Sequence, residues 1–440
     1  MLNTLPYYSD DATIKLDYNY KIKSIIAIAP VDGQYAPGKT RTKLKDINYF
    51  VIHGAQDGDV SSFAGARQFD RVSFTESMYR FKSGLYVYGA NHGQFNTSWG
   101  NNDVGTPFTR LLNLKQLLKG EDQREIAKVY ISAFLETTLR NDKRYLPLFA
   151  DVRTGKDWLP ETIYLTQFED SNTKLIGTFE EDFDVTTITT DSSLVSSSKL
   201  TVWMEKKIPM KWGSKNSRGL FLGWHYKKKD IDAKKEKDSV AAKDEMKHFT
   251  PVHDSLIASY SIKLNRGISE IDSTSVFVFS MAESKEGSDP KSGGKWIDKN
   301  KKNKEKEVNK NKNKKNENKD DADNKNDNKD DKKNKGKDPI DFSISLSDTN
   351  GENVYFPLSH FSKLQRRLGV KVWKRDFNSG EKSENVMQLF SFSMKDMLTL
   401  NPKFDFSNIV EINFIFDKTN KGVVVVDNIG FMKDLRTVLD

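Results

Sequence analysis

The chain has 440 residues, a net charge of +8 and no cysteine. Its length allows two or three domains, and the lack of cysteine excludes disulfides and thiol chemistry. The excess positive charge lies at 227–247 and 295–338, where lysines are mixed with acidic residues and asparagines and aromatic residues are almost absent. A nucleic-acid surface needs basic residues clustered on a folded face, and no apolar run approaches the length of a membrane helix. We therefore expect no nucleic-acid partner and no transmembrane segment.

The segment 1–165 alternates strand and helix signals and is predicted to form an α/β domain. Residues 61–69 form a short helical candidate, and residues 124–139 carry apolar side chains at helical spacing, as in an amphipathic closing helix. This order indicates a mostly parallel sheet. Nearly continuous apolar runs, which are typical of parallel strands buried on both faces, occur at 24–29, 49–53 and 85–88.

The segment 166–440 contains many short β runs separated by polar turns, which predicts a β-sandwich or jelly roll. A charged insertion interrupts it at 227–247. A second interruption, at 297–338, is rich in Lys, Asn and Asp and almost free of apolar side chains, so we expect a disordered loop. The predicted fold class is therefore α/β followed by all-β.

Two titratable residues, Asp57 and His92, lie in glycine-bearing turns directly after the second and third predicted strands. Because the carboxyl ends of parallel strands meet at one edge of a sheet, we expect these side chains to converge. The carboxylate would then orient the imidazole as a general base. Asp59, two residues further on, is the rival acid, and an ordinary turn histidine is the alternative interpretation of His92.

Metal sites are not predicted. The turn at 57–59 lacks the full pattern of a calcium loop, and the other histidines lack the spacing of a zinc site. His53, at a strand end, is interpreted as a structural residue. We therefore expect no metal and no cofactor at Asp57 and His92.

At these motifs the sequence resembles the α/β-hydrolase family, in the branch of bacterial esterases, dienelactone hydrolases and polyester hydrolases. Segment 25–30 is similar to the sixth strand of that family, 51–57 to the seventh strand with its Gly-x-x-Asp turn, and 87–93 to the eighth strand with the catalytic histidine. The resemblance implies an incomplete α/β-hydrolase sheet, with the last three strands and the closing helix. It also implies that Asp57 is the acid and His92 the base of a triad that attacks esters, in a small molecule or a polymer.

The nucleophile of that family is missing from this sequence. Only 23 residues precede Ser24, and no Gly-x-Ser-x-Gly elbow occurs anywhere in the chain. We therefore interpret the chain as the C-terminal portion of a serine hydrolase, truncated and inactive alone, whose first half lies upstream of Met1 or in a separately encoded partner. The N-terminus also lacks the features of a signal peptide, so a secreted or periplasmic location requires an export signal upstream of Met1.

In the β region, 409–414 and 425–431 resemble the closing strands of galactose-binding-like jelly rolls, as found in carbohydrate-binding modules. This resemblance implies a glycan partner, and the acidic run at 180–182 is a candidate for a structural calcium ion in such a fold. The alternative function is therefore a non-catalytic glycan-binding or structural protein with a vestigial hydrolase segment. Five tryptophans are candidates for a sugar-stacking platform, although aromatic residues in strands more often belong to a core: Trp203, Trp212, Trp224, Trp296 and Trp373.

Overall fold

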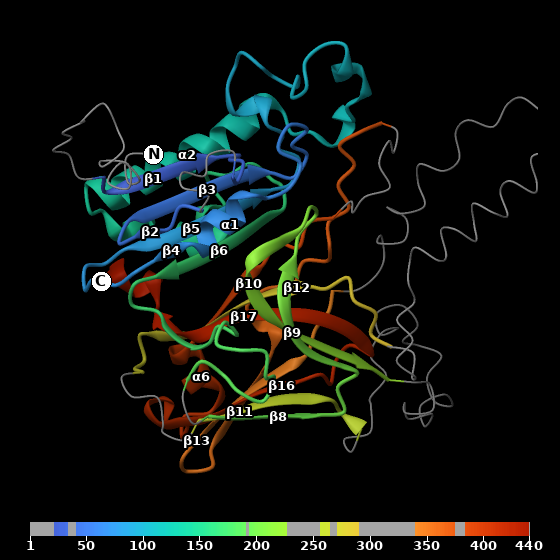
Figure 1. The fold of residues 1–440 in the computed structure, drawn as a ribbon. Coiled ribbons are helices and arrows are strands. Elements are labelled where there is room, and N and C mark those ends of the chain that lie inside the picture. The colour runs from blue at the N-terminus through green and yellow to red at the C-terminus, as the bar shows by residue number, and fades with distance from the viewer. Residues whose placement is uncertain are drawn as a thin grey trace, which may run out of the picture.

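The computed structural model in Figure 1 describes residues 22–33, 41–190, 193–226, 256–264, 271–289, 339–374 and 383–439. The predicted insertion at 227–247, the predicted disordered loop at 297–338 and Trp296 lie outside the described residues. The described residues form two packed parts. We call the small mixed sheet with its helices the upper layer, and the β-sandwich below it in Figure 1 the lower layer.

The upper layer is a four-stranded sheet in the order β1-β3-β5-β6. β1 (Ser24–Ile28), β3 (Asn48–Gly54) and β5 (Phe81–Val87) run parallel, and β6 (Tyr164–Asp170) pairs with β5 antiparallel. Every residue of β3 and β5 is buried, as expected for strands covered on both faces. A separate two-stranded sheet joins β2 (Leu44–Lys45) to β4 (Val72–Ser73).

Helices cover the two faces of this sheet because side chains alternate along each strand. On one face α2 (Gly120–Leu139) and α3 (Leu146–Ala150) pack against Phe50, whose ring stacks on Tyr130 of α2 with 5.7 Å between the centroids. On the other face Phe69 of α1 (Gly65–Asp70) packs against Tyr49. The helix expected at 124–139 is therefore present and begins four residues earlier.

The lower layer is a sandwich of two sheets in which neighbouring strands pair antiparallel. The first sheet has the order β15-β12-β17-β10-β9, with β7 paired to β17, and the second has the order β14-β13-β16-β11-β8. A helix, α6 (Met394–Leu400), follows β15. The strands are β7 (Lys174–Gly177), β8 (Leu194–Ser198), β9 (Val202–Pro209), β10 (Ser214–His225), β11 (Ser259–Lys263), β12 (Ser275–Glu283), β13 (Ser343–Asp348), β14 (Asn353–Pro357), β15 (Gln388–Ser393), β16 (Ile409–Ile415) and β17 (Lys421–Lys433).

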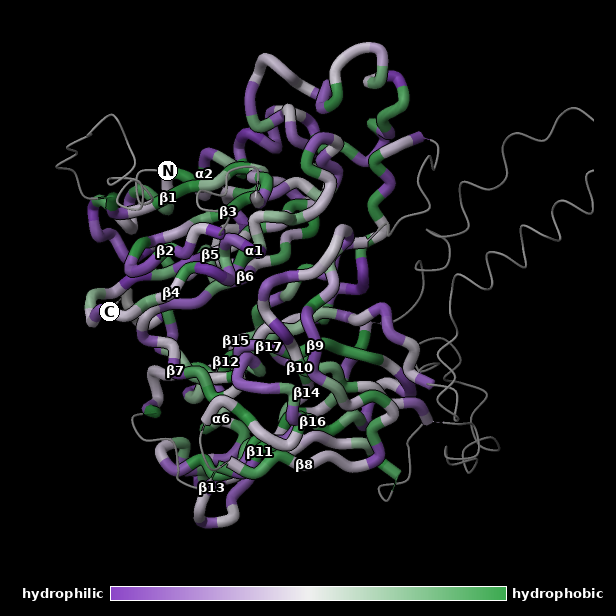
Figure 2. The backbone as a smooth tube through the Cα atoms, in the orientation of Figure 1, coloured by the Kyte–Doolittle hydropathy of each residue, from purple (hydrophilic) through white to green (hydrophobic). Residues whose placement is uncertain are grey.

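The predicted β-sandwich is confirmed. Its core is a large cluster of buried side chains from both sheets, including Trp224, Phe279, Phe342 and Phe414. Figure 2 shows hydrophobic segments running through the interior of both layers. The described part of the molecule is therefore mostly antiparallel β-structure with few helices, which is less α/β in character than the sequence suggests.

The two layers share apolar packing. Val276 and Met432, on the sandwich sheet that faces the upper layer, belong to the same buried cluster as Phe81 and Phe168 of the mixed sheet. The chain passes from one layer to the other through β6, which spans the predicted boundary between 1–165 and 166–440. That division into domains stays a prediction.

Candidate functional site

The structure brings Asp57 and His92 together at the carboxyl ends of β3 and β5. Gly54 and Val87, the last residues of these strands, are partners in the parallel register, so the turns that follow lie side by side. Oδ2 of Asp57 is 2.9 Å from Nδ1 of His92. Oδ1 of Asp57 accepts the backbone N–H groups of Asp59 at 2.9 Å and Val60 at 2.6 Å, so this fully buried carboxylate is held at both oxygens.

Burial and the hydrogen bond between Asp57 and His92 shift the pKa values of both side chains. Burial raises the pKa of the Asp57 carboxyl, while the hydrogen bond with His92 acts in the opposite direction. The hydrogen bond with Asp57 is the largest cause of the raised pKa of His92. The rival acid Asp59 lies on the other side of the ring, with Oδ2 3.7 Å from Nε2 of His92, so it is the more distant of the two carboxylates.

Asp103 is the residue of this region that sequence reasoning missed. Its carboxylate accepts the backbone N–H groups of Gly58 at 2.8 Å, His92 at 3.1 Å and Gly93 at 2.8 Å, and the side-chain amide of Asn91 at 2.7 Å. It therefore ties the two turns together. Asp103 lies in an irregular segment without a periodic pattern, so no local signal in the sequence marks it.

Aromatic rings stack on two histidines in this region, His92 and His53. The indole of Trp99 stacks on the imidazole of His92, with 5.8 Å between the centroids and 14° between the planes, and Trp99 is 56% exposed. His53 is buried between Phe63 and Tyr86, at 5.3 and 6.0 Å, and burial lowers its pKa to about 3. A neutral, enclosed imidazole agrees with its interpretation as a structural residue.

The described tryptophans of the predicted sugar platform do not gather on one surface. Trp224 is fully buried and stacks on Phe416 with 4.2 Å between the centroids. Trp203 and Trp373 are partly buried against two different apolar clusters. Trp212 is 44% exposed, and its Nε1 donates to Ser61 of the upper layer at 2.9 Å.

The predicted absence of metal stays a prediction, because the structure carries no ions. Within the described ranges, no group of three or more His, Asp or Glu side chains is arranged to hold a metal ion. Two side chains of the acidic run at 180–182 accept hydrogen bonds from other residues. Glu180 accepts the N–H of Arg218, and Glu181 accepts the hydroxyl of Thr189 at 2.9 Å.

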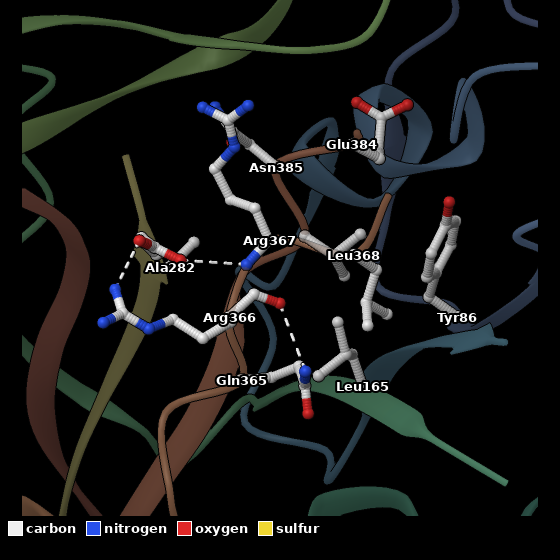
Figure 3. A pocket seen from close by; sticks show the side chains of 11 residues that line it. Tyr86, Leu165, Ala282, Gln365, Arg366, Arg367, Leu368, Glu384 and Asn385 are labelled. Carbon is white, nitrogen blue, oxygen red and sulfur yellow. Dashed lines mark hydrogen bonds and ion pairs between the residues drawn. The ribbon is translucent and has the colours of Figure 1, made fainter. Parts of the chain in front are cut away.

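A narrow cavity lies between the two layers (Figure 3). Its volume of about 20 Å³ has room for roughly one water molecule. Arg366 and the backbone N–H of Arg367 both bind the carboxylate of Glu283, at 2.6 and 3.0 Å. Glu384, which also lines it, accepts the Ser62 hydroxyl at 2.7 Å. This cavity is part of the packed interface between the layers and is too small for an organic ligand.

The outer face of the five-stranded sheet forms a second candidate site. Along each strand every second residue faces away from the core, and the register aligns these residues in three rows across the sheet. We call these rows the serine face. The middle row is Tyr355, Ser345, Asn413, Ser261 and Ser196, and the flanking rows are Pro357, Ser343, Ile415, Ser259 and Ser198, and Asn353, Ser347, Glu411, Lys263 and Leu194.

Some polar groups of the serine face are used by the fold, since the hydroxyls of Ser343 and Ser347 bind Asp417 and Asn353, but others are not. The side chains of Asn413, Ser261 and Ser196 make no hydrogen bond to another described residue. Tyr355 is 51% exposed, and its hydroxyl donates to the Asp417 carboxylate. Glu411 and Lys263 face each other at 3.9 Å, so their charges compensate. This face is therefore polar, close to neutral and bordered by one fixed aromatic ring.

Among the described residues, none of the helices combines the length and the apolar composition that crossing a membrane requires. No protein-family model matches the chain, and no curated protein matches it either. Solved structures do match. An exo-β-agarase has 10% sequence identity over 59% of this chain and 24% of its own, with a TM-score of 0.27, so this chain spans about a quarter of that agarase.

Two carbohydrate-binding modules are similar to the same extent. A family 30 module has 12% identity over 56% of this chain and 85% of its own, with a TM-score of 0.27. A family 11 module of a cellulosomal cellulase of Clostridium thermocellum has 10% identity over 59% of this chain and 94% of its own, with a TM-score of 0.25.

The prediction of an α/β-hydrolase that cleaves esters is wrong. The matching solved structures are carbohydrate-binding modules and agarases, and most described strands pair antiparallel. The predicted ester substrate and the predicted N-terminal half find no support. Two parallel strands, each followed by a polar turn, suffice to bring an aspartate and a histidine together. The pair Asp57 and His92 is therefore a property of the local topology and does not identify a hydrolase.

Proposed function

We propose that this chain is a non-catalytic glycan-binding protein and that the serine face is where the glycan lies. The observation that carries the proposal is the middle row of that face, from Tyr355 through Ser345, Asn413 and Ser261 to Ser196. Hydroxyl and amide groups both donate and accept hydrogen bonds, which suits the hydroxyl groups of a sugar. The row crosses five strands, about 19 Å at about 4.8 Å per step, which is long enough for an oligosaccharide.

The composition of the serine face supports a binding role because it contributes little to sheet stability. Solvated sheet faces are usually filled with β-branched or aromatic side chains, and serine is not among them. Ser343, Ser345 and Ser347 of β13 are buried, so the part of the face that a ligand can approach is the part formed by Asn413, Ser261 and Ser196 beside the Tyr355 ring. The inward residues of the same strands, such as Ile344, Phe414 and Ile262, are buried and apolar, so the unusual composition is confined to the outer side.

Tyr355 is the expected stacking platform. Its ring is half-exposed, and the same Asp417 carboxylate that accepts its hydroxyl also accepts the Ser343 hydroxyl at 2.8 Å. A ring held in this way loses little conformational entropy when a ligand binds. Because Lys263 and Glu411 compensate each other, we expect a neutral glycan to bind in preference to a polyanionic one.

The catalytic role of Asp57 and His92 stays a prediction, and we propose that the pair acts as a structural clamp in this protein. Both oxygens of Asp57 are occupied by His92 and by backbone N–H groups, and Asp103 joins the same turns. These contacts fix the loops at the end of the mixed sheet without requiring a nucleophile.

Affinity electrophoresis through gels that contain soluble neutral polysaccharides tests the proposal. Mixed-linked β-glucan, xylan and agarose are suitable probes, with polygalacturonate as the polyanionic comparison. We expect at least one neutral polysaccharide to retard the wild-type protein. Tyr355→Ala should weaken that affinity at least tenfold, and Ser261→Lys, which places a long charged side chain in the middle row, should abolish it.

Trp158→Ala is the matched control, because Trp158 is equally exposed at 53% but belongs to the segment that precedes β6. It should leave retardation unchanged. Absence of retardation by every neutral polysaccharide, or equal retardation of wild type and Tyr355→Ala, would overturn the proposal.

A further inference from the structure

A cavity of about 490 Å³ lies between the two layers, away from the serine face. Phe69 and Ser73 of the upper layer line one side of it, and Ser217 of β10 and Asp427 of β17 line the other. Its volume falls in the range of small-molecule pockets, about 300–1,000 Å³. The cavity is therefore large enough for a ligand that both layers contact.

A β-bulge in β17 builds one wall of this cavity. Val426 and Ile429 both point into the sandwich core, so two residues, Asp427 and Asn428, occupy the place of one outward residue. Asn428 has φ of +52°, a left-handed conformation that non-glycine residues seldom adopt. Bulges often re-aim side chains beside binding sites, and here both bulge residues line the cavity.

Asp427 is a buried carboxyl with an unused oxygen. The residue is 4% exposed, and its Oδ1 accepts the N–H of Asn428 at 2.8 Å. No side chain or N–H in the described segments donates to Oδ2. The nearby ammonium group of Lys215 pairs with Asp70 at 2.9 Å, not with Asp427. Because Asp427 lines the cavity, a partner for this oxygen can enter from there.

Carboxyl groups outnumber cations around the cavity. Asp70, Glu169, Asp170, Glu180 and Asp427 all line it. Lys82 is the cation in the lining, and it already binds Glu169 at 3.1 Å and the Val72 carbonyl at 2.9 Å.

The surplus of carboxyl groups favours a cationic ligand. No group of carboxylates in the described ranges is arranged to hold a metal ion, so an organic cation fits better than a metal. Hydroxyl and amide side chains of the same lining, among them Ser73, Thr178 and Asn216, suit hydroxyl groups on that ligand.

We propose that this cavity binds a small hydroxylated organic amine of the amino-sugar class, with its ammonium group on Oδ2 of Asp427. Burial raises the pKa of Asp427 well above its ordinary range, and Lys215 acts against that shift while Asp70 and Glu180 add to it. An ammonium ligand favours the ionised carboxylate. Binding is therefore expected to release a proton from Asp427 and to tighten as the pH rises, as long as the pH stays below the pKa of the ammonium group of the ligand.

Isothermal titration of the full chain with D-glucosamine tests this site, with D-glucose and N-acetyl-D-glucosamine as neutral molecules of similar shape. Wild type should bind glucosamine and bind both neutral sugars at least tenfold more weakly. Asp427→Asn keeps the shape of the side chain and removes the negative charge, so it should weaken glucosamine binding at least tenfold. Glu125→Gln, which removes a carboxylate from the exposed side of α2, should have no effect.

A second variant keeps the site testable if Asp427→Asn misfolds. Ser73 is exposed and lines the cavity, so Ser73→Lys places a competing ammonium there without altering the interior, and it should also weaken glucosamine binding at least tenfold. Failure of wild type to bind glucosamine, equal binding of glucose, or unchanged binding by both variants would refute the site. Tyr355→Ala should bind glucosamine normally, so this test and the polysaccharide test can fail independently.

Discussion

The turns of the upper layer and the serine face of the lower layer are both rich in polar side chains, but they use them differently. In the turns, Asp57 and Asp103 accept hydrogen bonds from neighbouring turns and from His92. On the serine face, the side chains of Asn413 and Ser261 make no hydrogen bond to another described residue. The polar groups of the turns are thus used to stabilise the fold, whereas the side chains of Asn413 and Ser261 keep their donors and acceptors available for a ligand.

The largest expected effect comes from removing the carboxylate that joins the layers. Glu384 accepts the Ser62 hydroxyl at 2.7 Å and the N–H groups of Phe63 at 2.9 Å and Lys211 at 2.7 Å. Glu384→Ala leaves three donors without this acceptor and should lower the free energy of unfolding by about 4 kcal/mol. Urea unfolding measures this. The control is Glu286→Ala, which removes a partly exposed ion pair with Lys206 and should change stability by less than about 1 kcal/mol.

A somewhat smaller loss is expected at the clamp of the upper layer. Asp57→Ala removes the acceptor of two backbone N–H groups and of His92, so the free energy of unfolding should fall by about 3 kcal/mol. Asp59→Ala is the matched control, because the Asp59 side chain is 59% exposed, and should cost at most about 0.5 kcal/mol. Equal losses for the two variants would contradict the assignment of Asp57 as the clamp.

The pH dependence of stability should change at His92. Its pKa is raised in the folded protein, chiefly by Asp57, so the folded state binds the proton more tightly than the unfolded state. This contribution is complete below the unfolded value of about 6.5 and is lost as the pH rises through the folded pKa. Wild type should therefore lose stability relative to His92→Gln as the pH rises above about 6.5, measured by urea unfolding across that range. Parallel pH profiles would show that the pair contributes nothing.

The smallest effect is predicted on the serine face, and it has the opposite sign. Ser261→Thr introduces a residue with higher β-propensity and should raise the free energy of unfolding by about 0.5 kcal/mol. The same change adds a methyl group to the middle row and should weaken polysaccharide binding. Thermal unfolding combined with affinity electrophoresis separates the two readouts. A loss of stability on this substitution would indicate that serine is needed there for the fold.

Local patterns predicted the parallel strands, the closing helix and the meeting of Asp57 with His92, because each depends on neighbours in sequence or on strand order. They did not predict that β6 returns antiparallel to β5, since the segment before it looks like a domain boundary. The alternation at 343–347 is visible in the sequence, but its alignment with Asn413 and Ser261 depends on the pairing of strands far apart in the chain. The prediction of a hydrolase failed because turn motifs report topology more directly than chemistry.

The shared packing of Val276 and Met432 with Phe81 and Phe168 limits how this molecule can be recombined. A sandwich cut away from the mixed sheet would carry an apolar patch that no linker covers, so it could not be transplanted into another protein as a free-standing cassette. Any gene fusion that moves the serine face therefore has to carry the mixed sheet with it.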